Sequence, residues 1–208
     1  MKSILWRNIH VFVFLILILN AITSLAQHTK MGHTMEQLKS KQKQELIVIA
    51  LHILKEKQPS LVINFENFES TVWGNSKEIL VKFRRIIRYV PFGIDPEKRF
   101  SYDITVNLNT NEVSPFDDWF QSEFYIETKV DQKALAFIKK NFGSFSANFE
   151  NTIYEGEEDY FIDSNNQYSF GKYKVNKRTG IVKTEIQGSY EPMPKPIIEN
   201  PDDYSEIK

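Results

Sequence analysis

One four-residue sequence occurs twice in this chain, and that recurrence limits the possible folds more than any other feature. Asn-Phe-Glu-Asn stands at residues 64–67 and again at 148–151, an offset of 84 residues (148 minus 64). The residues before the two copies match at the same offset, as Lys55 and Lys139 do. Because self-similarity at a fixed spacing is typical of repeated structural units, the chain is expected to contain two related units.

A second recurring pattern lies further along each unit. Val-Asn-x-x-Thr-x-x-Val begins at Val106 and again at Val175, an offset of 69 residues (175 minus 106). The two offsets differ by 15 residues (84 minus 69), so the first unit should carry an insertion of that size between its two landmarks. The turn-rich segment 91–98 is the expected insertion.

In each unit a helical pattern precedes strand patterns. Apolar residues recur at three- and four-residue spacing over about 35–57 until Pro59, and a shorter helix follows Asp131, an expected N-cap, until Gly143. The expected fold is α+β, with two tandem helix-plus-antiparallel-sheet repeats after a signal peptide. The expected order is a signal peptide at 1–26, a flexible tail at 27–34, a first helix-and-sheet repeat at 35–122, a second at 123–190, and a Pro-rich tail at 191–208 that could lie along the sheet.

The N-terminus has the pattern of an export signal. A basic start and an apolar run at 11–19 are followed by small residues at Ser24 and Ala26, three and one positions before a cut at Gln27. We therefore expect a periplasmic or secreted protein with no stable membrane anchor after cleavage. The alternative is an uncleaved anchor over residues 4–25, although polar residues interrupt that stretch.

Composition argues against most catalytic classes. The sequence has no cysteine, and its four histidines stand at positions 10, 28, 33 and 52, so little is available for a nucleophilic triad. The formal alternative is a carboxylate pair drawn from Asp117 and Asp118 with the acids at 155–159. A net charge of −1 argues against a nucleic-acid partner. We expect a protein that is not an enzyme and has no cofactor.

The strand expected at 80–89 separates apolar from cationic side chains. By the two-residue period of a strand, one face carries Val81, Phe83, Ile87 and Tyr89 and the other carries Lys82, Arg84 and Arg88. The cationic face is a candidate docking surface for an acidic partner, because Arg engages carboxylates with two parallel hydrogen bonds. Alternatively it is a solvated face, or it is paired internally with Glu155, Glu157, Glu158 and Asp159.

Two other segments are candidate binding sites. The connector at 114–123 places Trp119 and Phe120 beside two acids, so it is either a packing plug between the units or a recognition loop for a partner. The N-terminal tail gathers imidazole and thioether groups, which suit copper, and the alternative is a linker in which these residues are incidental. The residues of that copper reading are His28, Met31, His33 and Met35.

The final hairpin resembles that of a known family. The sequence Tyr-Lys-Val-Asn-x-x-Thr-Gly-x-Val at 173–182 is similar to the last hairpin of PepSY-like domains, and the whole unit looks cystatin-like. In the first unit Asn111 occupies the place of Gly180. The resemblance implies a binding or inhibitory module of exported proteins, with no catalytic residues to carry over.

Two functions follow as hypotheses. The first is an exported, non-enzymatic module that binds a protein or peptide, as an inhibitor or as the immunity protein of an exported toxin. Its candidate contacts are Lys82, Arg84, Arg88, Trp119 and Phe120. The second is a periplasmic protein that binds a small ligand or copper through the N-terminal tail.

Overall fold

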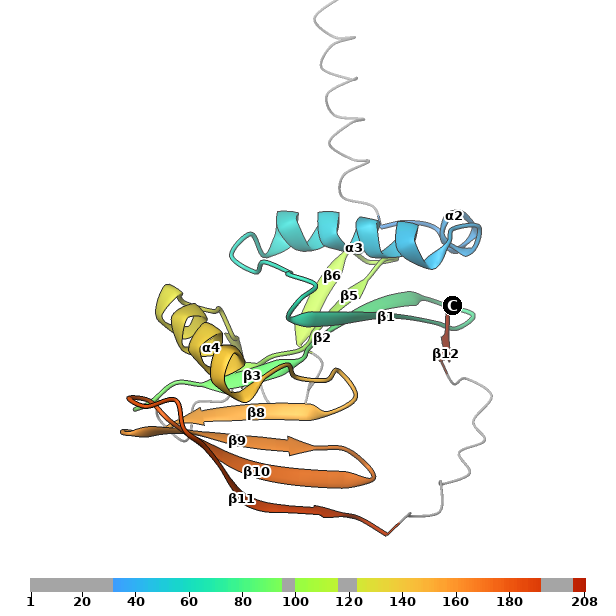
Figure 1. Ribbon diagram of the computed structural model, residues 1–208. Coiled ribbons are helices and arrows are strands. Elements are labelled where there is room, and N and C mark those ends of the chain that lie inside the picture. Colours follow the sequence, from blue (N-terminus) through green and yellow to red (C-terminus); the bar gives the residue numbers. More distant parts are fainter. Residues whose placement is uncertain (1–31, 95–99, 116–122, 192–203) are drawn as a thin grey trace, which may run out of the picture.

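The computed structural model describes residues 32–94, 100–115, 123–191 and 204–208. They form an α+β protein in which two five-stranded sheets each carry one long helix (Figure 1). The expected signal peptide at 1–26 and most of the tail at 27–34 lie outside the described residues, as do Trp119 and Phe120. No helix among the described residues is both long and apolar enough to cross a membrane.

The first sheet is antiparallel and is covered on one face by helix α3 (Figure 1). The expected helix at 35–57 is two helices, because Ser40 ends the first and a capping box of Gln42 and Glu45 begins the second. The helices are α2 (Met35–Lys39) and α3 (Lys43–Lys57). The strand order is β12 (Ser205–Glu206), β1 (Phe68–Gly74), β2 (Ile79–Arg85), β5 (Ile104–Asn107) and β6 (Glu112–Pro115).

The second sheet carries helix α4 (Lys129–Phe142) and has one parallel edge strand (Figure 1). The N-cap lies three residues before the expected one: Thr128 is the N-cap, and Asp131 is its capping-box partner. The strand order is β11 (Val182–Ser189), β10 (Ser169–Asn176), β9 (Asp159–Asn165), β8 (Glu150–Glu155) and β3 (Ile87–Val90). A short parallel pair, β4 (Phe100–Ser101) and β7 (Glu123–Phe124), lies outside both sheets.

Each half has its own hydrophobic core between helix and sheet. In the first, Leu46 and Ala50 of α3 pack over strand residues such as Phe83, which are all fully buried. In the second, Ile138 of α4 packs over Ile153 of β8. Burial of the apolar side chains in these two cores is the main favourable contribution to folding. The chain has no cysteine, so no disulfide adds to it.

The two halves share one strand that passes from the first sheet into the second. Only Ile86 separates β2 from β3, and β3 pairs with β8 of the second half. At this crossing Ile86 donates its N–H to the carbonyl of Asn67 (2.8 Å), and its own carbonyl accepts from the side chain of Asn151 (3.0 Å). The final Asn of each recurring sequence therefore binds the backbone at the crossing. The expected unit at 35–122 thus contributes β3 to the second sheet, so a boundary at 122 does not separate the two sheets.

The turns β5–β6 and β10–β11 share one geometry. The side chains of Asn107 and Asn176 each accept hydrogen bonds from the backbone two and three residues ahead. The residue with positive φ is Asn111 (φ 59°) in one turn and Gly180 (φ 71°) in the other. Asn111 therefore takes the place of the glycine, since Asn tolerates the left-handed region better than most residues.

We expect the two halves to unfold together, because neither sheet can lose the β2–β3 strand alone. Ile104→Val in the first core and Ile162→Val in the second remove one methylene from side chains that are nearly fully buried. Each should lower the free energy of unfolding by about 0.5–1.5 kcal/mol. Urea denaturation followed by circular dichroism and by tryptophan fluorescence should give one coincident transition that both variants shift. Two separate transitions, each moved by one variant, would contradict this coupling.

Candidate functional site

The cationic face predicted for the crossing strand exists, and acidic side chains of the protein neutralise it. Lys82, Arg84 and Arg88 are all partly exposed, while their neighbours along the strand are buried. Asp103 lies between two of them, 3.9 Å from Lys82 Nζ and 3.4 Å from Arg88 Nη2. Its side chain is only 7% exposed, so both cations help to compensate a buried carboxylate.

The sequence-based alternative of internal pairing named the wrong acids. The partners of the cationic face are Asp103 and Glu69, rather than the acids at 155–159. Glu155 instead binds Lys177 at 2.7 Å, and Asp159 binds Lys174 at 2.9 Å. These acids and bases lie on neighbouring strands and turns of the second half.

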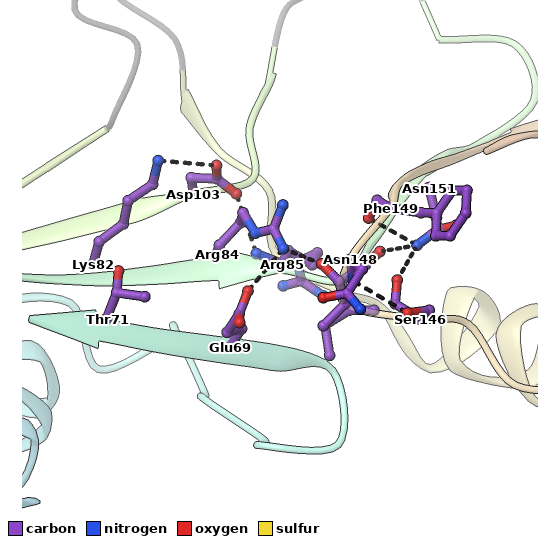
Figure 2. A network of polar contacts seen from close by, with 12 residues as sticks. Glu69, Thr71, Lys82, Arg84, Arg85, Asp103, Ser146, Asn148, Phe149 and Asn151 are labelled. Carbon is purple, nitrogen blue, oxygen red and sulfur yellow. Dashed lines mark hydrogen bonds and ion pairs between the residues drawn. The ribbon is translucent and has the colours of Figure 1, made fainter. Parts of the chain in front are cut away.

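Arg84 bonds both halves of the protein. Its Nη2 donates to Glu69 Oε2 at 2.7 Å and to the backbone carbonyl of Ala147 (Figure 2). The side chains of Arg84 and Glu69 are 30% and 42% exposed, so their ion pair is well solvated and contributes little to stability. Both bonds use Nη2, and a guanidinium has five N–H donors, so Arg84 can accept a further acidic partner.

A groove runs over the face of the first sheet that lies opposite α3. We call it the open-face groove. Its volume is about 520 Å³. Trp73 and Leu80 provide apolar surface, and the Trp73 ring is oriented by a hydrogen bond from Nε1 to Thr71 (3.0 Å). The residues that line it are Glu69, Thr71, Trp73, Leu80, Lys82, Arg84, Thr105 and Tyr204.

A second, more polar hollow adjoins the open-face groove at Arg84. It has a volume of about 580 Å³ and reaches the β9–β10 turn of the second half. Its other lining residues are Asn148, Glu150, Asn165, Asn166, Gln167 and Tyr168. Arg84 thus stands where an apolar hollow meets one lined by carboxamides. These adjoining surfaces would match an elongated ligand that has an apolar part, an acidic group and a backbone able to form hydrogen bonds.

Arg85 is the important residue that the sequence analysis missed. The two-residue period from Val81 and Phe83 places it on the buried face, and it is 7% exposed. Its Nη1 donates to Glu127 Oε2 at 2.8 Å, and its guanidinium carbon lies 4.5 Å from the centroid of the Phe68 ring. Burial lowers the pKa of Arg85, while the nearby carboxylate opposes that shift. The alternation of inward- and outward-facing positions, continued from Val81 and Phe83 to residue 85, was the sequence signal that could have identified Arg85 as buried.

Arg85 borders a cavity of about 230 Å³ between the two halves. Amide side chains, one acid and one base share its wall with apolar side chains, so it can accommodate water or a small polar molecule. Its lining residues are Ser60, Leu61, Val62, Asn64, Asn67, Phe68, Arg85, Tyr125, Ile126, Glu127 and Gln132. The Nε of Arg85 is buried and has no hydrogen-bond partner in the described part of the chain.

Two buried tyrosines donate to carboxylates in the second half. Tyr125 bonds Asp131, and Tyr89 bonds Glu155, both at 2.8 Å. Burial, reinforced by these acidic acceptors, raises the pKa of both hydroxyls well above the ordinary value. Both tyrosines therefore remain protonated and act as donors. Tyr125 links the segment before α4 to that helix, and Tyr89 links β3 to the end of β8.

The copper reading is only partly within the described residues, because His28 and Met31 lie outside them. His33 donates its backbone N–H to the Leu108 carbonyl at 3.1 Å, and the Met35 side chain packs against the first core. In the described part of the chain, no group of three or more His, Asp or Glu side chains is placed to hold a metal ion.

Comparison with models of protein families, with curated proteins and with solved structures finds no match to this chain. The assignment of a role therefore depends on the geometry of the groove and its neighbours.

We predict that Arg85 and Glu127 are strongly coupled. Arg85→Met should lower the free energy of unfolding by about 3–5 kcal/mol, because it leaves a carboxylate that is only 15% exposed without its cation. Adding Glu127→Leu to Arg85→Met should restore much of that loss, since apolar side chains can replace a buried ion pair. Urea denaturation of the two single variants and the double variant measures the coupling. Purely additive losses would show that the pair is unimportant.

We also predict that Glu155 makes stability depend on pH in the acid range. Burial alone would raise the pKa of Glu155, but hydrogen bonds from Lys177, the Phe92 amide and Tyr89 outweigh it and hold the pKa below its ordinary value of 4.5. The unfolded chain then binds this proton more readily, so stability present above about pH 4.5 is lost as pH falls through the lower, folded pKa.

The measurement is urea denaturation of the wild type and Glu155→Gln between neutral and acid pH. The difference in the free energy of unfolding between the two proteins should shrink as the pH falls. Glu157→Gln removes a charge from the same segment without touching Lys177, Phe92 or Tyr89, and it should leave the pH dependence nearly unchanged. An equal flattening by both variants would refute the assignment to Glu155.

Proposed function

We propose that this protein is an exported, non-enzymatic module that binds a protein or peptide through the open-face groove. The observation that carries the proposal is the combination of apolar surface from Trp73 and Leu80 with the partly exposed Arg84 at one end of the same groove. Aromatic and Arg side chains are the residues that most often dominate binding energy at protein interfaces.

The groove favours a partner that is apolar and acidic. An apolar side chain over Trp73 would be removed from water, and a carboxylate beside Arg84 would form a charge-assisted hydrogen bond. Lys82 and Arg88 contribute a positive field although Asp103 is their near partner. An inhibitor of an exported enzyme, or the immunity protein of an exported toxin, would use a surface of this kind.

The proposal includes the architecture and location expected from the sequence. We take the two halves to be a tandem duplication of one PepSY-like or cystatin-like unit, delivered outside the cytoplasm after cleavage of residues 1–26. Support comes from the same succession in both halves, a helix followed by four antiparallel strands in meander order, and from the matched turns at Asn107 and Asn176. Those turns are the segments on which the family resemblance depends.

The test begins with a ligand selected from random linear peptides displayed on phage, with residues 27–208 as bait. The affinity of the selected peptide is then measured by calorimetry for the wild type, Trp73→Ala and Arg84→Glu. Each substitution should weaken binding at least tenfold, which corresponds to about 1.4 kcal/mol. Both positions are partly exposed, so the folded structure should tolerate the changes.

Lys172→Glu is the matched control for charge reversal. Lys172 lies on β10 of the second sheet, is 56% exposed and pairs with Asp163 at 3.6 Å. It should leave the affinity within about twofold, because Lys172 lines neither the open-face groove nor the adjoining hollow. If peptide binding survives both Trp73→Ala and Arg84→Glu, the open-face groove is not the binding surface.

A further inference from the structure

The chain already places one of its own segments against the edge of the first sheet. Strand β12 pairs antiparallel with β1 (Figure 1). In this register Glu206 lies opposite Trp73 and Ser205 opposite Gly74. Ile207 continues the ladder by donating its N–H to the Val72 carbonyl at 2.8 Å. This is the geometry in which an extended peptide adds a strand to a sheet.

Three side chains of the segment 204–208 meet separate receiving surfaces. Tyr204 lines the open-face groove and its hydroxyl donates to Glu78. Glu206 pairs with Lys43 of α3 at 3.2 Å. Ile207 is partly buried against the first core. The edge of β1 and its surroundings therefore contact an aromatic residue, an acid two positions later, and an aliphatic residue directly after the acid.

Gly74 makes room for the aliphatic residue. A Cβ placed on Gly74 would lie 3.0 Å from Ile207 Cδ1, tighter than nearly all real contacts of that kind, and 3.6 Å from Ile79 Cγ1. The φ of Gly74 is not in the positive range that favours glycine, so backbone conformation does not demand glycine here. Space for the incoming side chain is the reason that the structure offers.

The resident segment leaves part of the edge unused. It pairs with β1 from Val72 to Gly74, and no strand among the described residues pairs with 68–71 on that side. In the antiparallel register, residues that follow the aliphatic position of a longer peptide would lie opposite 71 and then 70, 69 and 68. A peptide strand that continues past the aliphatic position could therefore form ladder hydrogen bonds with 68–71, which no strand among the described residues forms on that side.

We infer that the outer edge of β1 is a strand-accepting site for an extended peptide with the pattern aromatic-x-acid-aliphatic, and that residues 204–208 occupy it until such a peptide replaces them. The inference rests on the proposed peptide-binding function and names its ligand class. Backbone pairing supplies affinity, and the Tyr204, Glu206 and Ile207 surfaces supply specificity. The resident segment is tethered by residues 192–203, so it competes at the high effective concentration of an intramolecular ligand.

The experiment uses the full chain and a fluorescent peptide with the sequence of residues 203–208. Ile207→Asp in the chain should release the resident segment, because a carboxylate would replace an aliphatic group packed against the core. Fluorescence anisotropy should then show saturable binding of the wild-type peptide to Ile207→Asp, at least tenfold tighter than to the wild-type chain. Adding Gly74→Val to Ile207→Asp should abolish that binding.

Ile186→Asp is the matched control on the opposite sheet. Ile186 lies on the edge strand β11 and is 52% exposed, so the variant introduces the same charge without vacating the edge of β1. It should bind the peptide no better than the wild type. Equal binding to wild type, Ile207→Asp and the double variant with Gly74→Val, or binding to none of them, overturns the strand-accepting site.

A charge exchange at the surface gives a second test. In the Ile207→Asp chain, adding Lys43→Glu should favour the peptide that carries Glu206→Lys over the wild-type peptide by a few-fold, and Ile207→Asp alone should not share that preference. An identical ranking of the two peptides by both chains would also count against the site. If these tests fail while the phage-selected ligand still depends on Trp73 and Arg84, the groove is retained and only the strand-accepting edge is wrong.

Discussion

The crossing of one strand between two sheets is the constraint on which the rest of the structure depends. At Ile86 the strand leaves the ladder of the first sheet and enters that of the second, so its backbone groups need partners outside a regular ladder. Asn67 supplies a carbonyl and Asn151 supplies a side-chain amide. Lys139 of α4 in turn donates to the Asn67 side chain at 2.6 Å, which links the second helix to the loop of the first half. A partly buried polar network of this kind is stabilising only when its members are satisfied.

Next to this crossing, two adjacent arginines face opposite sides of the strand. The two-residue period turns Arg84 outward, where it borders both hollows of the open face, and Arg85 inward, where it meets Glu127 and two aromatic rings. Arg suits the buried position because its delocalised charge stacks on aromatic faces and is weakly hydrated. The proposed binding surface and the internal ion pair therefore use successive residues of one strand, so changes near the crossing should affect both stability and the proposed recognition.

The open face and the edge of the first sheet form one continuous surface. Tyr204 belongs to both, since it lines the open-face groove while the residues after it pair with β1. A strand bound at that edge would place an aromatic side chain over Trp73 and Leu80 and bring its acid toward Lys43. We propose that the open sheet face and the edge of β1 act as complementary parts of one recognition surface, from which residues 204–208 leave when a peptide binds.

The sequence by itself predicted the local features: the helical segments, the alternation of 80–89, and the recurring Asn-x-x-Thr patterns at the two hairpin turns. It also showed that residues 64–67 and 148–151 recur, but not that Asn67 and Asn151 meet at Ile86. Only the tertiary structure decided that β3 joins the second sheet, that Asp103 neutralises Lys82 and Arg88, and that residues 204–208 pair with β1. The physical reason is the separation along the chain between the residues that interact. Periodicity and turn chemistry are settled within a few neighbouring residues, whereas the partner of a sheet edge or a buried charge depends on segments brought together from far along the chain.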